Sequence, residues 1–540
     1  MAADAAAGAA PGRILSGIGR RLAIATPVTA ASEAGLQAVL GGGSAVDAAI
    51  SANAVLTVAY PHMCAVGGDL LALVATPAGR VHAINGSGAA PLRIDVEAVR
   101  RSGAMPITGP LTISVPGTLQ GWSALSRIGG RLELAAVLAP AIALARDGAQ
   151  VTASLARSLI SHADVVAADA GLRGVLLADG RPLGVGDTFC QPALAETLET
   201  VASGGADAFY AGPLAGRFVE GLARLGSPLG LDDLAAHRTE VTNPLAGDYR
   251  GFEVLTMPPN SQGILLLEML AALEPLVERL DPAGKDAPLI AEVMRIISLD
   301  RDRWLADPRA RPVPVAALLD PGRLRAIGER AIRRIASGER PTEHAQPLRS
   351  DTVAIVAADS DGWRVVIIQS IFHGFGSGIL EPGTGILCHN RGAHFSLDPL
   401  AANVLAGGKR PVHTLMPVMV RRAGRVTHLS GTMGGTAQPQ IQAQILGRVL
   451  DLGMSPETAL QEPRWVVGGL ELGAPPDTVN IESRLAALAP SFAACGMPTQ
   501  LLGVWDEEVG QAQLIAIGEG GELAVATDPR ADGSVATLSR

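Results

Sequence analysis

Cysteine and lysine are both scarce in this chain of 540 residues. The four cysteines lie far apart and form no CxxC pair, which argues against a zinc finger and against a disulfide framework. The only lysines are Lys285 and Lys409, no long block of basic residues occurs, and the net charge is −9. This charge pattern argues against a nucleic-acid groove or an anionic membrane surface as the partner. We therefore expect the partner to be a small molecule.

Long apolar runs are missing as well. The longest uncharged stretches, such as residues 48–68, are interrupted by polar side chains and by Pro61, so they fall short of the roughly 18 apolar residues that span a bilayer. The first 21 residues carry their charges after a stretch of small residues, with no apolar segment behind them, unlike a secretory signal. The sequence thus predicts no membrane contact and a cytoplasmic location.

The apolar residues that are present, with 48% of the chain hydrophobic and 18% charged, indicate a globular protein. Helical periodicity occurs in residues 45–60, 135–147, 192–202, 263–280, 288–305 and 437–452. Pairs of apolar runs around turn residues predict β-hairpins over 70–84, 352–371, 418–430 and 513–527. Hairpins interleaved with apolar helices indicate antiparallel sheets covered by helices on their outer faces. The expected fold is α+β, a four-layer αββα sandwich with one shared core, in which residues 281–287 and 307–347 are exposed connections.

Several common catalytic motifs are absent or incomplete. No GxSxG nucleophile elbow occurs, and the glycines of residues 375–385 are not followed by a helix, which argues against an α/β-hydrolase and against a dinucleotide site. Half of the ten histidines fall within 56 residues: His373, His389, His394, His413 and His428. No HExxH or similar pair is present, so we expect neither a metal nor a cofactor. These histidines are interpreted as the polar lining of a substrate pocket, or as ordinary hydrogen-bonded side chains.

An ordered set of motifs runs through nearly the whole chain. Its N-terminal members are Ala25-Thr-Pro-Val28, Gly42-Gly-Ser-Ala-Val-Asp-Ala-Ala49, Gly67-Gly-Asp69, Val115-Pro-Gly117, Asp207-Ala-Phe-Tyr210 and Met257-Pro-Pro259. Its C-terminal members are Phe375 to Gly385, Lys409-Arg-Pro411 and Ser430-Gly-Thr-Met-Gly-Gly435. With this set the chain resembles the gamma-glutamyltranspeptidase family of N-terminal nucleophile hydrolases, whose fold is the sandwich expected above.

The resemblance implies a self-processing precursor. Members of the family cut themselves before a threonine, and the spacing to Phe375 identifies that residue as Thr352, with the cut between Asp351 and Thr352. Residues 1–351 would form a large subunit and residues 352–540 a small subunit that carries the nucleophile, with a dimer of these pairs as the candidate assembly. Cleavage would free an α-amine with a pKa of roughly 8 beside the hydroxyl, where it can act as the general base.

The other catalytic positions of the family are also present. Gly434 and Gly435 would offer two adjacent backbone N–H groups to the oxyanion that develops during acyl transfer. Ser370 stands where the family keeps a hydroxyl that hydrogen-bonds the nucleophile.

Positions that recognise a glutamyl group are changed. The resemblance places Ser87 where family members specific for γ-glutamyl groups have an arginine that holds the α-carboxylate. His394 replaces an acidic residue, Phe372 an asparagine, and His413-Thr414 a pair of serines. Val353 and Ala354 replace the polar pair that normally follows the nucleophile, which weakens the expectation of efficient self-processing.

This pattern is similar to the branch that includes oxamate amidohydrolase and the cephalosporin acylases. We therefore expect an amide hydrolase that forms an acyl-enzyme at Thr352, with Arg391 or a neighbouring histidine as the cation for an acidic acyl group. Three alternatives remain at this point: a γ-glutamyl hydrolase or transpeptidase, an unprocessed member that only binds a ligand, and a biosynthetic relative that cleaves a C–C bond next to a carbonyl.

Overall fold

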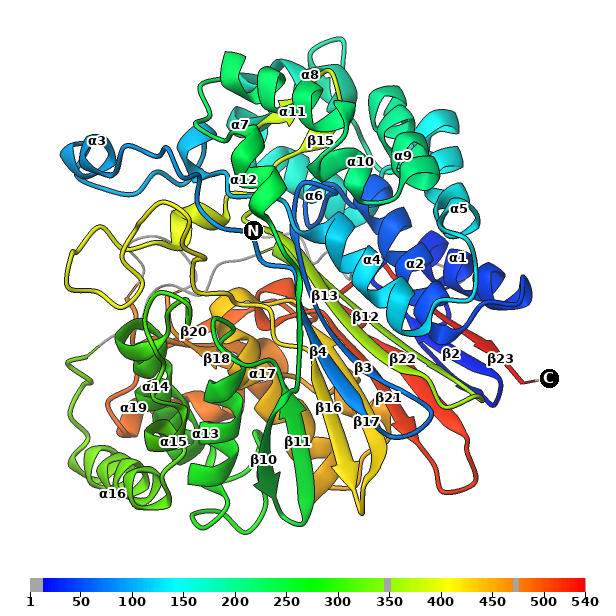
Figure 1. Cartoon of the computed structure of the whole chain (residues 1–540). Coiled ribbons are helices and arrows are strands. Elements are labelled where there is room, and N and C mark those ends of the chain that lie inside the picture. Colours follow the sequence, from blue (N-terminus) through cyan, green and yellow to red (C-terminus); the bar gives the residue numbers. More distant parts are fainter. Residues whose placement is uncertain (1–12, 344–350, 470–474, 540) are drawn as a thin grey trace.

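Two seven-stranded antiparallel sheets lie face to face at the centre of the molecule, with helices on their outer faces (Figure 1). The computed structural model describes residues 13–343, 351–469 and 475–539. The first sheet has the order β1 (Ser16–Gly19), β22 (Leu523–Thr527), β21 (Ala512–Ile517), β17 (Arg425–Thr432), β16 (Val418–Arg422), β11 (Phe252–Thr256), β10 (Leu245–Tyr249). The second has the order β23 (Val535–Leu538), β2 (Leu22–Ala25), β12 (Asp351–Asp359), β13 (Arg364–Phe372), β3 (Asp69–Ala75), β4 (Val81–Asn85), β9 (Glu240–Thr242).

Alternation along the strands explains the layers. In β12, Val353, Ile355 and Ala357 pack against the helices, while Ala354, Val356 and Ala358 pack between the two sheets. Successive side chains of a strand point to opposite faces, so a strand that is apolar at every position is buried on both sides. The predicted αββα sandwich is thereby confirmed.

Each sheet has its own helical layer. The sheet that contains β12 is covered by α1 (Thr29–Leu40), α2 (Ala45–Ala59), α4 (Thr118–Gly129) and α5 (Leu134–Asp147), with α9 (Pro192–Gly204) and α11 (Pro213–Arg224) further out. The other sheet is covered by α13 (Gly263–Leu273), α14 (Ala287–Trp304), α16 (Pro321–Ser337), α17 (Gln438–Leu446) and α18 (Pro456–Gln461). In the described ranges no helix combines the length and the apolar character that a membrane crossing needs.

Two expectations about the helices are wrong. The helix predicted over 263–280 ends at Leu273, because Pro275 has no N–H with which to continue the helix. The predicted exposed connection 307–347 contains the 17-residue helix α16, which begins after Asp320 as N-cap. Its apolar positions Leu324, Ile327 and Ala331 are buried against the layer of α13 and α14. The abundant arginines of this segment obscured that stripe; residues 344–347 lie outside the described part of the chain.

The segment after residue 351 is interleaved with the segment before it. The hairpin β12–β13 pairs with β2 on one side and with β3 on the other, so it occupies the middle of its sheet. In Figure 1 the yellow-green hairpin accordingly lies between strands coloured blue. A cut between residues 351 and 352 would therefore leave two chains that share one core.

Candidate functional site

Thr352 lies at the beginning of β12, at one end of the sandwich. It pairs with Ser370 of β13, whereas Asp351 pairs with Phe372, so Ile371 is an extra residue on β13 and forms a β-bulge there. A bulge bends the strand and changes where its side chains point, and such irregularities concentrate beside active sites. The Thr352 side chain is buried, and its Oγ1 donates a hydrogen bond of 3.0 Å to Ser370 Oγ.

Ser370 connects the proposed nucleophile to the peptide bond that precedes it. Its hydroxyl donates to the carbonyl oxygen of Asp351 at 2.5 Å and accepts a hydrogen bond of 2.8 Å from the backbone N–H of Phe372. A donor at a carbonyl oxygen stabilises the negative charge that develops there during nucleophilic attack. The structure therefore places a hydroxyl donor at the carbonyl oxygen of the bond between Asp351 and Thr352.

The diglycine of residues 434 and 435 follows β17 after one intervening residue, Met433. Both residues have positive φ, 134° and 52°, and a Cβ at Gly434 would lie 2.5 Å from Ile441 Cδ1, so a residue with a side chain would be strained there. The amide of Gln262 donates to the carbonyl oxygens of Gly435 at 2.7 Å and of Thr414 at 2.8 Å. Through Thr414, this contact connects the diglycine loop to the arginine described next.

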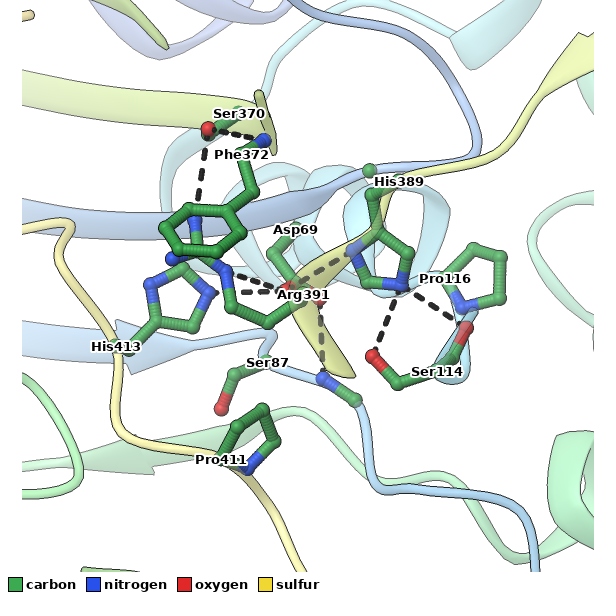
Figure 2. A network of polar contacts seen from close by, with 12 residues as sticks. Asp69, Ser87, Ser114, Pro116, Ser370, Phe372, His389, Arg391, Pro411 and His413 are labelled. Carbon is green, nitrogen blue, oxygen red and sulfur yellow. Dashed lines mark hydrogen bonds and ion pairs between the residues drawn. The ribbon is translucent and has the colours of Figure 1, made fainter. Parts of the chain in front are cut away.

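Arg391 is completely buried beside Ser370, in a short 3-10 turn of residues Arg391–His394. Its Nη1 donates to Thr414 Oγ1 at 3.1 Å, and its Nη2 lies at 3.5 Å from Ser370 Oγ. The guanidinium stacks on the Phe372 ring, 4.1 Å from the ring centroid, as Figure 2 shows. Burial lowers the pKa of Arg391 to about 9, although the nearby Asp69 acts in the opposite direction.

Asp69, the first residue of β3, is the carboxylate of this cluster. Its Oδ1 accepts a hydrogen bond of 3.1 Å from the Gly88 N–H, and its Oδ2 lies 2.9 Å from His413 Nε2 and 3.2 Å from His389 Nδ1 (Figure 2). Burial alone would raise the pKa of Asp69, but the two facing histidines lower it below its usual range. In the sequence Asp69 stands within the motif Gly67-Gly-Asp69, and no pattern there indicates its role.

The two histidines are oriented by further contacts. The Leu415 N–H donates to Nδ1 of His413, so Nε2 of that ring carries the hydrogen that faces Asp69. Nε2 of His389 lies 2.9 Å from the Ser114 carbonyl oxygen, on the side of the ring opposite to Asp69. Burial, with Arg391 nearby, lowers the pKa of His413 to about 4.

The remaining predicted positions are gathered around the same cluster. Ser87 Oγ donates to Asn85 at 2.7 Å and accepts from Asn260 at 3.2 Å. His394 contacts the Val412 carbonyl oxygen through Nδ1 at 2.8 Å, and its ring lies beside Phe372. Of the five clustered histidines, His428 alone lies elsewhere, on β17. No group of three or more His, Cys, Asp or Glu residues in the described ranges is arranged to hold a metal ion.

Buried neutral histidines make the fold sensitive to acid. Burial lowers the pKa of His62 to about 3 and that of His413 to about 4, whereas histidine in an unfolded chain titrates near 6.5. Their stabilising contribution is therefore complete above pH 6.5 and is lost as the pH falls towards 4 and then 3. For His413 alone we expect the free energy of unfolding to decrease by about 3 kcal/mol between pH 6.5 and pH 4.

Urea denaturation at pH 7, 5.5 and 4 measures this loss. The variant His62→Gln keeps a polar side chain near Ser154 Oγ, which lies 3.1 Å from His62 Nε2. Because glutamine does not titrate, this variant should lose less stability over the same pH range. Equal stability of the wild-type protein at pH 7 and pH 4 would contradict the expectation.

Comparisons with known proteins agree with this architecture. The family model described as Gamma-glutamyltranspeptidase matches residues 31–538. The chain is 36% identical over 524 residues to the glutathione hydrolase-like YwrD proenzyme of Bacillus subtilis (strain 168), covering 96% of this chain and 98% of that protein. It is 37% identical over 519 residues to the oxamate amidohydrolase proenzyme of Klebsiella pneumoniae, covering 94% and 96%.

A solved structure agrees as well. The crystal structure of a cephalosporin acylase from Bacillus halodurans superposes with a TM-score of 0.90 at 32% identity, and the match covers 100% of both chains. The fold is therefore that of the N-terminal nucleophile hydrolases. The chain belongs to the gamma-glutamyltranspeptidase family, and within it resembles the amidohydrolases and acylases.

Proposed function

We propose that this protein is a self-processing amide hydrolase whose nucleophile is Thr352. The observation that carries the proposal is the contact of one hydroxyl, that of Ser370, with both Thr352 Oγ1 and the Asp351 carbonyl oxygen. The proposed nucleophile and the carbonyl that it would attack thus contact the same hydroxyl, which supports the proposal.

Self-processing would proceed as an acyl shift. Thr352 Oγ1 attacks the carbonyl carbon of Asp351, the hydroxyl proton passes to the departing nitrogen, and the peptide bond becomes an ester. Water then hydrolyses this ester, which leaves a carboxylate on Asp351 and a free α-amine on Thr352. The products are the large subunit of residues 1–351 and the small subunit of residues 352–540.

Turnover would use the same hydroxyl with its new base. The α-amine of Thr352 takes the Oγ1 proton as the oxygen attacks the substrate amide, and this proton then leaves with the released amine. Gly434 and Gly435 are proposed to donate their N–H groups to the tetrahedral oxyanion. In the described part of the chain neither N–H group donates to another protein atom, which supports this role. Water finally releases the acyl group as an acid.

Glutamyl specificity has less support than hydrolysis of other amides. Ser87, at the position of the arginine that would clamp a glutamyl α-carboxylate, hydrogen-bonds to Asn85 and Asn260. Phe372 and His394 stand where a glutamyl group would meet polar or acidic partners, and their ring centroids lie 5.2 Å apart. We therefore place γ-glutamyl transfer second. No observation favours C–C bond cleavage.

One observation argues against the alternative in which the chain stays uncut and only binds a ligand. Val353 and Ala354, whose apolar character weakened the expectation of processing, are both buried in β12 and pair in register with Gln369 and Ile368. Their side chains contribute to the two layers of the core, so they are compatible with the position of Thr352 at the strand end.

Intact-mass measurement of the purified protein tests the proposal. We expect two polypeptides whose masses correspond to residues 1–351 and 352–540, and N-terminal sequencing of the smaller one should begin at Thr352. The split protein should release amine from an acyl 4-nitroanilide, whereas γ-glutamyl 4-nitroanilide should react slowly. A single chain of 540 residues without amidase activity would reject the proposal.

A further inference from the structure

Arg391, the buried cation beside Ser370, has no role in the mechanism above. We infer that Arg391 binds a carboxylate carried by the acyl group of the substrate, and that it restricts the enzyme to acyl groups in which this carboxylate lies close to the scissile carbonyl. The inference rests on the proposed function, because it concerns the acyl side of the same site.

The guanidinium retains donors for a ligand. Nη1 donates a hydrogen bond to Thr414 Oγ1, and Nη2 has only the contact of 3.5 Å with Ser370 Oγ. Nε has no hydrogen-bond partner among the described residues. Nε lies 3.8 Å from Asp69 Oδ2, which exceeds hydrogen-bond distance. Nε and Nη2 form one edge of the guanidinium, the planar fork that binds a carboxylate through two parallel hydrogen bonds.

The cluster holds this edge in place. Phe372 covers one face of the guanidinium and Thr414 binds one end of it. Asp69 supplies a counter-charge, while its own oxygens already face the Gly88 N–H and the rings of His413 and His389. A buried cation with unused donors is costly for the folded protein. A preorganised anion site next to the nucleophile accounts for that cost.

The spacing of the nucleophile and the cation indicates which acyl groups can reach both. Ser370 Oγ lies 3.0 Å from Thr352 Oγ1 and 3.5 Å from Arg391 Nη2, so nucleophile and cation contact the same hydroxyl. A reacting carbonyl carbon approaches its nucleophile to about 3 Å, and a carboxylate oxygen lies about 2.8 Å from a guanidinium nitrogen. We therefore expect a short acyl group, with no more than two carbons between carbonyl and carboxylate as in oxalyl, malonyl and succinyl amides, to reach both groups best. A γ-glutamyl group has three carbons between them.

A series of 4-nitroanilides with one leaving group tests this inference on the processed enzyme. Oxalyl 4-nitroanilide carries the carboxylate, and pyruvoyl 4-nitroanilide replaces it by a neutral acetyl group of similar shape. We expect kcat/KM to be roughly 100-fold higher for the oxalyl compound, the ratio associated with losing a bidentate charged hydrogen bond. Succinyl 4-nitroanilide should react faster than glutaryl 4-nitroanilide.

In the Arg391→Gln variant, kcat/KM for the oxalyl compound should fall roughly 100-fold, whereas kcat/KM for the pyruvoyl compound should change little. Arg391→Lys keeps the charge without the fork, so its loss should be smaller. The control is Arg448→Gln: Arg448 is also buried, with a pKa lowered to about 9 by burial, and it bonds to the Ala459 carbonyl oxygen away from Thr352. It should reduce stability while preserving the substrate ratio.

Two results would overturn the inference: equal rates of the wild-type enzyme on the oxalyl and pyruvoyl compounds, or an equal loss on both in Arg391→Gln, which would indicate a structural role. If Arg391→Gln does not fold, the wild-type ratio and Arg391→Lys decide. A split enzyme that neither cleaves the oxalyl compound nor binds oxalate by calorimetry also rejects it. Failure of the proposed function looks different, because the chain then stays uncut and releases 4-nitroaniline from no substrate.

Discussion

Thr352→Ala is expected to remain a single chain of 540 residues and to hydrolyse no amide. The substitution removes the hydroxyl that lies 3.0 Å from Ser370 Oγ, so the attack on Asp351 cannot begin. Without the cut, the α-amine that serves as general base is not formed either. Nucleophile and base are lost together, and the residual rate should be at least about 10⁴-fold below that of the wild type.

Two control variants make this result specific. Thr352→Ser keeps an Oγ at the same position and should still be split, more slowly or at a similar rate. Thr112→Ala removes another buried hydroxyl, one that donates to the Gly109 carbonyl oxygen at 2.7 Å within its own turn, and should be split normally. Mass spectrometry of the three variants after equal incubation gives the answer. A split Thr352→Ala protein would assign the nucleophile to another residue.

Much of the fold could be predicted because its signals are local. The alternation in β12 and β13 is carried by neighbouring residues, and the capping residue Ser44 precedes the periodic stretch of α2. The sequence does not predict helix α16, because arginines separate its buried apolar positions Leu324, Ile327 and Ala331 and give the segment the composition of an exposed connection. The apolar residues of this segment do have helical spacing, but its high arginine content favours an exposed connection.

The candidate site divides in the same way. Thr352 and Ser370 are partners across one hairpin, so their proximity follows from the hairpin prediction and from their spacing. Asp69, His389 and His413 come from three separate segments, and only the assembled sheets bring them together. The stacking of Phe372 on Arg391 depends on a backbone φ of 82° at Phe372, which no sequence pattern indicates. The residue types were visible in the sequence, whereas their grouping was not.

The second large effect is expected on the free energy of unfolding, because Asp69 balances the charge of the buried Arg391. Asp69→Asn preserves the shape of the side chain but removes the only carboxylate that faces Arg391 within 4.0 Å in the described chain. The amide group would also have to meet His413, whose Nε2 is held as a donor by the Leu415 contact. A buried cation that loses its counter-charge destabilises a protein by about 3 to 5 kcal/mol. We expect a loss near the lower end, about 3 kcal/mol, because Asn retains the bond from Gly88.

Oxalate distinguishes the cause of this loss. If Arg391 lacks an anion in Asp69→Asn, bound oxalate supplies one, so it should raise the melting temperature of this variant more than that of the wild type. The matched control is Asp47→Asn: Asp47 is equally buried and accepts backbone N–H groups of Ser44 and Arg131, but it forms no ion pair with the described residues. It should lose about 1 to 2 kcal/mol and gain nothing from oxalate. If oxalate does not raise the melting temperature of Asp69→Asn above the effect on the wild type, the instability of this variant arises from lost hydrogen bonds. The unbalanced charge of Arg391 is then not the cause.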